Sequence, residues 1–275
     1  MFEALGFQFF RHALLVAILA SIAAGIIGTY IVVKRMSMIS GSIAHAAFGG
    51  LGISYYLQTN PLFGAIVFSL ASAIGIGVSR EGSKRRIDTL LSFMWSVGMA
   101  IGLVFIFMTT GYANDLFTYL FGNILLVSGS DLLLIAALDI VIIVTVVILY
   151  NPLQLVVFDE EYARTRNLPV GLINIILYSL IALTIVATIR LVGIVLMIAI
   201  LTIPSATASM FFKRMRSIMI ASSLITLVST VGGLFLSYTL DFSTGPIIIL
   251  LIAAIFLISK MVSSIPWSHI FSRRV

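Results

Sequence analysis

Long apolar runs dominate this sequence, and the short gaps between them carry almost all of its positive charge. Hydrophobic residues make up 61% of the 275 residues, charged residues make up only 9%, and the mean hydropathy is +1.20. A soluble domain carries roughly 25% charged residues, so no water-soluble fold could cover this apolar surface. Hydrocarbon can, if every backbone amide is satisfied inside a helix or a closed barrel. Because the runs are continuous and do not alternate, they predict an all-α, multi-pass membrane protein.

A helix needs about 20 apolar residues to cross the hydrocarbon. The predicted spans are approximately 11–33, 38–58, 62–79, 90–110, 132–150, 171–189, 191–211, 217–239 and 244–262. A shorter stretch, 116–127, could be a re-entrant or interfacial helix, so the count stays open between eight and ten. We therefore predict about eight or nine transmembrane helices in a single domain over residues 1–275.

The charges assign a side to each loop. With nine spans and an outer N-terminus, all but two of the 16 Lys and Arg residues fall on one side, and the exceptions are Arg11 and Arg190. The positive-inside rule makes the basic side cytoplasmic. The net charge of +6 is then explained by the cytoplasm and anionic lipid headgroups, with no need for nucleic acid. Cysteine is absent from the sequence, which excludes thiolate metal sites and disulfides.

The segment 151–169 is the one sizeable cytoplasmic element. Six of its residues give it the chemistry of a short capped helix: Asp159, Glu160, Glu161, Tyr162, Arg164 and Pro169. The aspartate can accept from the first free amides, the glutamates lie at the positive end of the helix dipole, and the proline ends the helix. Two interpretations stay open. One is a connector folded against the headgroups, and the other is a docking helix for a cytoplasmic protein.

Two ionisable side chains are predicted to lie at membrane depth, where such groups are functional candidates by default. His45 lies in the second span, with Gly41 one turn before it and Gly49 one turn after. These small residues would let a helix pack closely or leave room for a passing ion beside the ring. The alternative is an imidazole that only bonds to a neighbouring helix. Asp139 lies in the fifth span among Leu, Ile and Val, where a carboxylate must pair, neutralise or line water.

Three carboxylates fall at outer ends of spans, namely Asp115, Asp131 and Asp241. They could form an acidic mouth that attracts cations, or they could be ordinary solvated loop ends. Pro204 is predicted to interrupt and kink the seventh span, because proline removes an amide donor. The hydroxyls of Ser205 and Thr207 can bond to carbonyls freed in this way. A kink here would suit a gate, although many kinks are packing features.

Motifs for chemistry are missing. There is no G-x-x-x-x-G-K-[ST] loop for ATP and no H-E-x-x-H zinc motif. No Ser/His/Asp grouping stands in a plausible site. The sequence therefore predicts neither an enzyme nor a cofactor bound by this chain.

Several segments, in order, resemble the permease subunits of binding-protein-dependent ABC transporters for zinc, manganese and iron. The matching segments are 34–40 running into 45–47, 119–125, 158–164, 192–196, 204–208, and Asp241 with Gly245 and Pro246. The resemblance implies a type II importer-like permease in a prokaryotic cell membrane. It also implies a second copy, a cytoplasmic ABC ATPase that holds the ATP, and an extracellular or periplasmic protein that delivers the metal. Residues 158–168 would be the coupling helix set into that ATPase.

The resemblance also implies that His45 contacts the metal, with Asp241 at the outer mouth. In the family an Asp usually precedes the His by four residues, but this sequence has Gly41 there. Asp139 could supply the second ligand if its span packs nearby, or the site could be weaker and transient, since conduction requires release. Zinc and manganese are equally expected, with iron third. The alternatives are an ATPase-independent secondary transporter or channel, and an ABC permease for a metal chelate.

Overall fold

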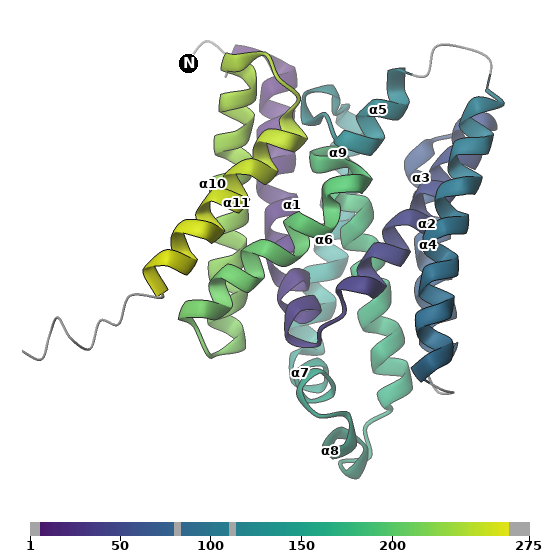
Figure 1. Ribbon diagram of the computed structural model, residues 1–275, viewed down its shortest axis with the longest axis vertical. Coiled ribbons are helices and arrows are strands. Elements are labelled where there is room, and N and C mark those ends of the chain that lie inside the picture. The colour runs from purple at the N-terminus through teal and green to yellow at the C-terminus, as the bar shows by residue number, and fades with distance from the viewer. Residues whose placement is uncertain (1–5, 80–83, 110–113, 264–275) are drawn as a thin grey trace, which may run out of the picture.

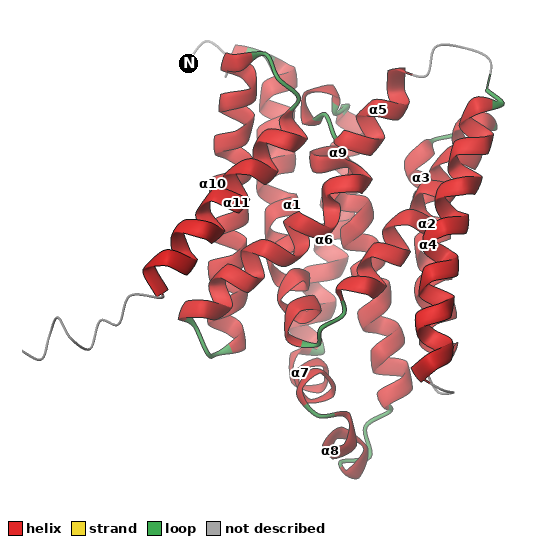
Figure 2. Ribbon diagram, in the orientation of Figure 1, coloured by secondary structure: helices red, strands yellow, loops and turns green. Residues whose placement is uncertain are grey.

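The computed structural model describes residues 6–79, 84–109 and 114–263, which are helical with short turns and contain no strand (Figure 2). In chain order the elements are α1 (Gln8–Val33), α2 (Ser37–Tyr56), α3 (Pro61–Ser79), α4 (Lys84–Phe107), α5 (Asn114–Phe121), a 3-10 helix (Ile124–Leu126), α6 (Gly129–Ile148), α7 (Tyr150–Phe158), α8 (Glu160–Thr165), α9 (Val170–Phe211), α10 (Met215–Leu240) and α11 (Thr244–Ser263). The predicted all-α class is confirmed.

Among these described residues, eight helical segments are long and apolar enough to cross a membrane, with the two halves of α9 counted separately. α2 is a further long helix, rich in Gly and Ser, and most of it is buried against α3, α4 and α9. The nine predicted spans therefore match nine helical segments, with ends that differ by a few residues. The stretch 116–127 forms α5 and the 3-10 helix, which lie at the upper end of the bundle beside α9 (Figure 1).

The turns and helix ends at the lower end of the bundle (Figure 1) are rich in basic residues. The turns and helix ends found there carry Lys34, Arg35, Arg164, Arg166, Lys213, Arg214, Arg216 and Lys260. Arg11, by contrast, is in the first turns of α1 at the upper end. Arg80, Arg273 and Arg274, which were assigned to the same basic side, lie outside the described residues. The charge pattern read from the sequence thus corresponds to two ends of one helical bundle, and the lower end is the one assigned to the cytoplasm.

Glycines bring α2 and α4 into backbone contact. A Cβ placed on Gly49 would lie 3.0 Å from the carbonyl oxygen of Gly98, and one on Gly52 would overlap Gly102. Small residues permit such close helix packing in membranes. Of the two roles predicted for this glycine strip, close packing is confirmed for Gly49 and Gly52, because the backbone of α4 fills the space that an ion would need.

The break in α9 is at Gly193 and not at Pro204, so the predicted interruption at the proline was wrong. Gly193 has φ 72° and ψ 173°, a conformation that glycine adopts without steric cost. A side chain there would also collide with the carbonyl of Leu120. The helix continues through Pro204, beside which the Thr207 hydroxyl donates to the Ile203 carbonyl at 2.8 Å. The proline is therefore accommodated inside a continuous helix.

Candidate functional site

The cytoplasmic segment folds as the sequence predicts. Asp159 is the N-cap of α8, and its Oδ1 accepts a hydrogen bond from the Tyr162 amide at 2.9 Å. Glu161 and Arg164 are exposed, and the Tyr162 side chain is 49% exposed. α7 and α8 project below the rest of the bundle (Figure 1). The short helix therefore presents an aromatic ring and both signs of charge away from the spans.

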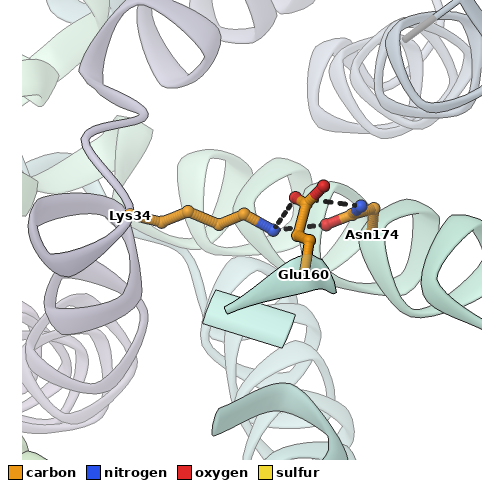
Figure 3. A network of polar contacts seen from close by, with 3 residues as sticks. All are labelled: Lys34, Glu160 and Asn174. Carbon is orange, nitrogen blue, oxygen red and sulfur yellow. Dashed lines mark hydrogen bonds and ion pairs between the residues drawn. The ribbon is translucent and has the colours of Figure 1, made fainter. Parts of the chain in front are cut away.

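A polar network joins α8 to the transmembrane helices (Figure 3). The Lys34 ammonium lies 2.8 Å from Glu160 Oε1 and donates to Asn174 Oδ1 at 2.5 Å. The Asn174 amide nitrogen donates to the same glutamate oxygen at 3.4 Å. The Lys34 side chain is only 6% exposed, so the ion pair is largely shielded from water. The network ties the end of α1, the start of α8 and the first turns of α9 together.

A cavity of 520 Å³ opens beside this network. It is lined by residues of the turn after α1 and of α2, α3, α4, α8 and α9, among them Met38, Asp88, Glu160 and Asn174. Asn174 bonds across helices to Lys34 after α1 and to Glu160 of α8. Lys34 was not predicted to belong to this network. In the sequence it is one of several basic residues at the end of a span, and no spacing relates it to Glu160 or Asn174.

His45 lies in the middle of α2 and is 8% exposed. Its ring stacks on the indole of Trp95 from α4, with 4.2 Å between the ring centroids and 32° between the planes. Its Nδ1 has no hydrogen-bond partner among the described residues. The alternative of an imidazole that only bonds to a neighbouring helix is therefore not seen at this nitrogen, which is buried at membrane depth without a hydrogen-bond partner among the described residues.

Gly41 is the reason that Trp95 fits here. A Cβ on Gly41 would overlap Cζ3 of the indole and would lie 2.9 Å from its Cη2 and 3.0 Å from Cδ1 of Ile198. Residues four apart on a helix lie on the same face, so position 41 is the natural origin of a second ligand beside His45. In this chain the indole fills that place. Trp95 was missed because nothing in the sequence relates it to Gly41.

Asp139 is not brought to His45. It is 1% exposed in α6, which packs chiefly against α1 and α9, whereas α2 packs chiefly against α4, α3 and α9. Both carboxylate oxygens are without a hydrogen-bond partner in the described part of the chain. The suggestion that Asp139 replaces the missing ligand of His45 within one chain is therefore not supported, because α2 and α6 are not among the extensively packed helix pairs of the described residues.

The acidic mouth is not seen as a cluster. Asp131 accepts from the Ser128 amide at 3.3 Å in a capping box of α6, so its carboxylate is used by the helix end. Asp241 is exposed at the C-cap of α10 with φ 56°. The side chain of Asp115 lies outside the described residues. Where the structure describes the chain, no three His, Cys, Asp or Glu side chains are grouped to hold a metal.

Three glycines from separate matching segments meet at the upper end. A Cβ on Gly122 would lie 2.6 Å from the Leu191 carbonyl oxygen, and one on Gly193 would lie 2.5 Å from the Gly122 amide nitrogen. Gly245 lies against the Phe121 carbonyl in the same way. Thr244 accepts from the Ile124 amide at 3.4 Å. Motifs that are far apart in the sequence thus form one tightly packed outer junction.

Taken with the fold, these features define a multi-pass helical membrane protein with a projecting cytoplasmic helix and a buried imidazole. Comparison with known proteins identifies the class. Residues 6–263 match the model of the ABC 3 transport family, and the chain belongs to that family. The resemblance to permease subunits of metal ABC transporters is confirmed, and the chain is a multi-pass protein of a prokaryotic plasma membrane.

Relatives cover nearly the whole chain. It is 43% identical over 259 residues to an uncharacterized membrane protein of Synechocystis, covering 94% of this chain and 92% of that protein. It is 33% identical over 257 residues to the manganese import system permease protein ScaB of Streptococcus parasanguinis, covering 94% and 91%. Its fold matches PsaBC from Streptococcus pneumoniae, solved in complex with Fab, with a TM-score of 0.84, 33% identity and coverage of 92% and 91%.

Proposed function

We propose that this chain is the membrane subunit of an ATP-driven importer of a divalent transition-metal ion. Two copies would form the pathway, a pair of cytoplasmic ABC ATPase subunits would bind below, and a metal-binding protein would deliver the ion from outside. The observation that carries the proposal is α8, a capped helix that projects from the bundle and is tied to α1 and α9 by Lys34, Glu160 and Asn174. A carrier without an ATPase has no need of such a helix.

α8 would act as the coupling helix. Tyr162 and Glu161 are exposed and would contact the ATPase, together with Arg164, which is exposed but also lines the cavity beside Glu160. Glu160 faces Lys34. Movement of the ATPase would thus reach the α1–α2 turn and the base of α9 through charge-assisted hydrogen bonds, which are stronger than neutral ones.

His45 would contact the ion in passage. A neutral imidazole nitrogen is a ligand for divalent transition metals, and this one has no competing hydrogen bond. A site of few ligands also suits transport, because the ion must leave again. α4 leaves Ser92 and Ser96 exposed near Trp95. Small hydroxyl residues at membrane depth suit a protein interface better than lipid, and we assign this face to the pathway between two copies.

Zinc and manganese are the leading cargoes, with iron third. The name of ScaB supports manganese, since that relative is a manganese import permease. Pro204 stays a candidate gate residue by position alone, and Asp241 a candidate outer contact for the cation. ATP would be bound and hydrolysed on the partner subunit.

The docking role is tested by co-purification. Glu161→Arg with Tyr162→Ala changes only exposed groups of α8 and leaves the Lys34–Glu160 pair intact. We expect the ATPase subunit to be lost from the purified complex and ATP-dependent metal uptake to fall, while insertion stays normal. Asn151→Ala, at an exposed site on α7, is the control. Unchanged recovery of the ATPase and unchanged uptake would remove α8 from the interface.

A further inference from the structure

We propose that Gly41 and Trp95 together determine metal specificity, because Gly41 carries no ligand and the Trp95 indole fills the place of one, which leaves His45 as the metal ligand here among the described residues. This inference rests on the proposed metal transport and narrows its cargo. It predicts a preference for cations that accept nitrogen ligands, such as Zn²⁺, over Mn²⁺.

The geometry of three residues carries the argument. His45 and Gly41 lie one helical turn apart on the same face of α2. Any side chain on Gly41 would enter the volume of the Trp95 ring. The indole in turn stacks on the imidazole at 4.2 Å. The tryptophan therefore occupies the space beside Gly41, a position one turn from His45 from which a carboxylate could share an ion with it.

The indole cannot replace the ligand that it excludes. Its nitrogen carries a hydrogen and has no free lone pair, so it can donate but not coordinate. Asp139 is an acidic side chain in the middle of a span, but it lies on α6, which packs chiefly against α1 and α9. What remains for an ion is the imidazole of His45, whose Nδ1 is buried and has no hydrogen-bond partner among the described residues.

Ligand chemistry then separates the metals. Imidazole suits zinc, copper, iron and nickel, whereas carboxylate and water oxygens suit manganese, magnesium and calcium. A site with nitrogen and no carboxylate should hold Zn²⁺ better than Mn²⁺. Gly41 and Trp95 act as a pair in setting this metal preference, because Gly41 has no side chain to bind the ion and Trp95 fills the space that such a side chain would need.

The test exchanges the pair. The complete transporter, with its ATPase and binding protein, is expressed in cells that lack their own uptake, and entry of Mn²⁺ and of Zn²⁺ is measured separately. In the double variant, Gly41→Asp introduces a carboxylate one turn from His45, and Trp95→Ala removes the ring that would collide with it. We expect the ratio of Mn²⁺ to Zn²⁺ uptake to rise about tenfold, as one further ligand contact of about 1.4 kcal/mol would give.

Matched variants isolate the cause. Trp95→Phe keeps an aromatic ring on the imidazole, and Trp95→Ala opens the space without a ligand, so both should keep the wild-type ratio. An unchanged ratio in a double variant that reaches the membrane would overturn the role of Trp95. If no variant or wild-type chain takes up either metal, it is the proposed function that fails.

A second measurement does not depend on the double variant. The sequence has two tryptophans, so Trp267→Phe leaves Trp95 as the only tryptophan of this chain, and the matched complex with Trp95→Phe as well gives the background emission of its partners. Adding Zn²⁺ to the purified complex should change Trp95 emission, because the bound ion alters the imidazole stacked on it. His45→Gln should abolish that change. If Zn²⁺ changes Trp95 emission to the same extent in the wild-type and His45→Gln proteins, or changes it in neither, the proposed site is contradicted.

Discussion

The polar groups at the inner end of this permease and those in the middle of its spans differ in how completely they are satisfied. Lys34, Glu160 and Asn174 bond to one another in one network. His45 Nδ1 and both oxygens of Asp139 have no partner among the described residues. Buried polar groups without partners are costly, so they are not kept for stability. In the proposed mechanism the satisfied network transmits movement, and an unsatisfied group is a candidate for contact with a passing ion.

The largest expected effect is at His45. His45→Ala should lower metal uptake about tenfold or more, because each 1.4 kcal/mol of lost ion binding is a factor of ten. Assembly with the ATPase should be unaffected, since Nδ1 makes no hydrogen bond that the fold would lose. Uptake and co-purification are measured on the same membranes. A normal uptake rate in His45→Ala would show that His45 is not on the ion pathway. It would also refute the idea that unpartnered groups in the spans contact the ion.

The next effect is at the inner ion pair. Glu160→Lys places a second cation against the shielded Lys34, and we expect a loss of about 1–3 kcal/mol together with weakened transport. The exchange Lys34→Glu with Glu160→Lys should restore most of both. Thermal unfolding in detergent and ATP-dependent uptake provide the two readouts. Glu161→Lys, on the exposed side of the same helix, should leave stability unchanged; an equal loss there would show that α8 simply tolerates no added cation.

A smaller effect is expected at the third member of the network. Asn174→Ala removes one bond to Lys34 and one to Glu160 but keeps their ion pair, so it should cost about 1 kcal/mol. The measurement is again the unfolding temperature of the purified complex. A loss as large as that of Glu160→Lys would mean that the amide, and not the ion pair, holds α8 in place.

The smallest effect is expected at Asp139. Asp139→Asn keeps the shape of the side chain and removes a carboxylate that has no described partner. Removing such a group from an apolar site should leave stability the same or slightly higher. Uptake should stay near the wild-type rate. A folded Asp139→Asn protein that no longer transports would put this carboxylate on the ion pathway, and would extend the rule drawn from His45.

Local signals in the sequence predicted most of the fold. Continuous apolar runs located the spans, the distribution of basic residues identified the inner end, and Asp159 before two glutamates predicted the cap of α8. These features depend on neighbours within a few residues. Pro204 misled because the helix continues through it, while the true break at Gly193 depends on backbone contact with Leu120 from another segment.

The site was harder to predict because its members come from separate helices. His45 was identified from its type and depth alone, but Trp95 is 50 residues further along the chain and carries no sign of its partner. The same holds for Lys34, which meets Glu160 only through the fold. For Asp139 a contact was suggested that the described structure does not support, because lying at a similar depth in the membrane to His45 does not place the two side chains close together. Tertiary packing decides which helices are neighbours, and the chemistry of single residues does not predict it.

The reversal at Gly193 has a consequence for how the chain can be modified. The sixth and seventh crossings meet without an intervening loop, and the backbones of Leu120 and Gly122 lie directly on the turn. An epitope inserted at this point would have to force apart three segments, whereas the turn at 212–214 has exposed residues on the opposite end. Surface tagging of this permease should therefore succeed at the inner turn and fail at the outer one.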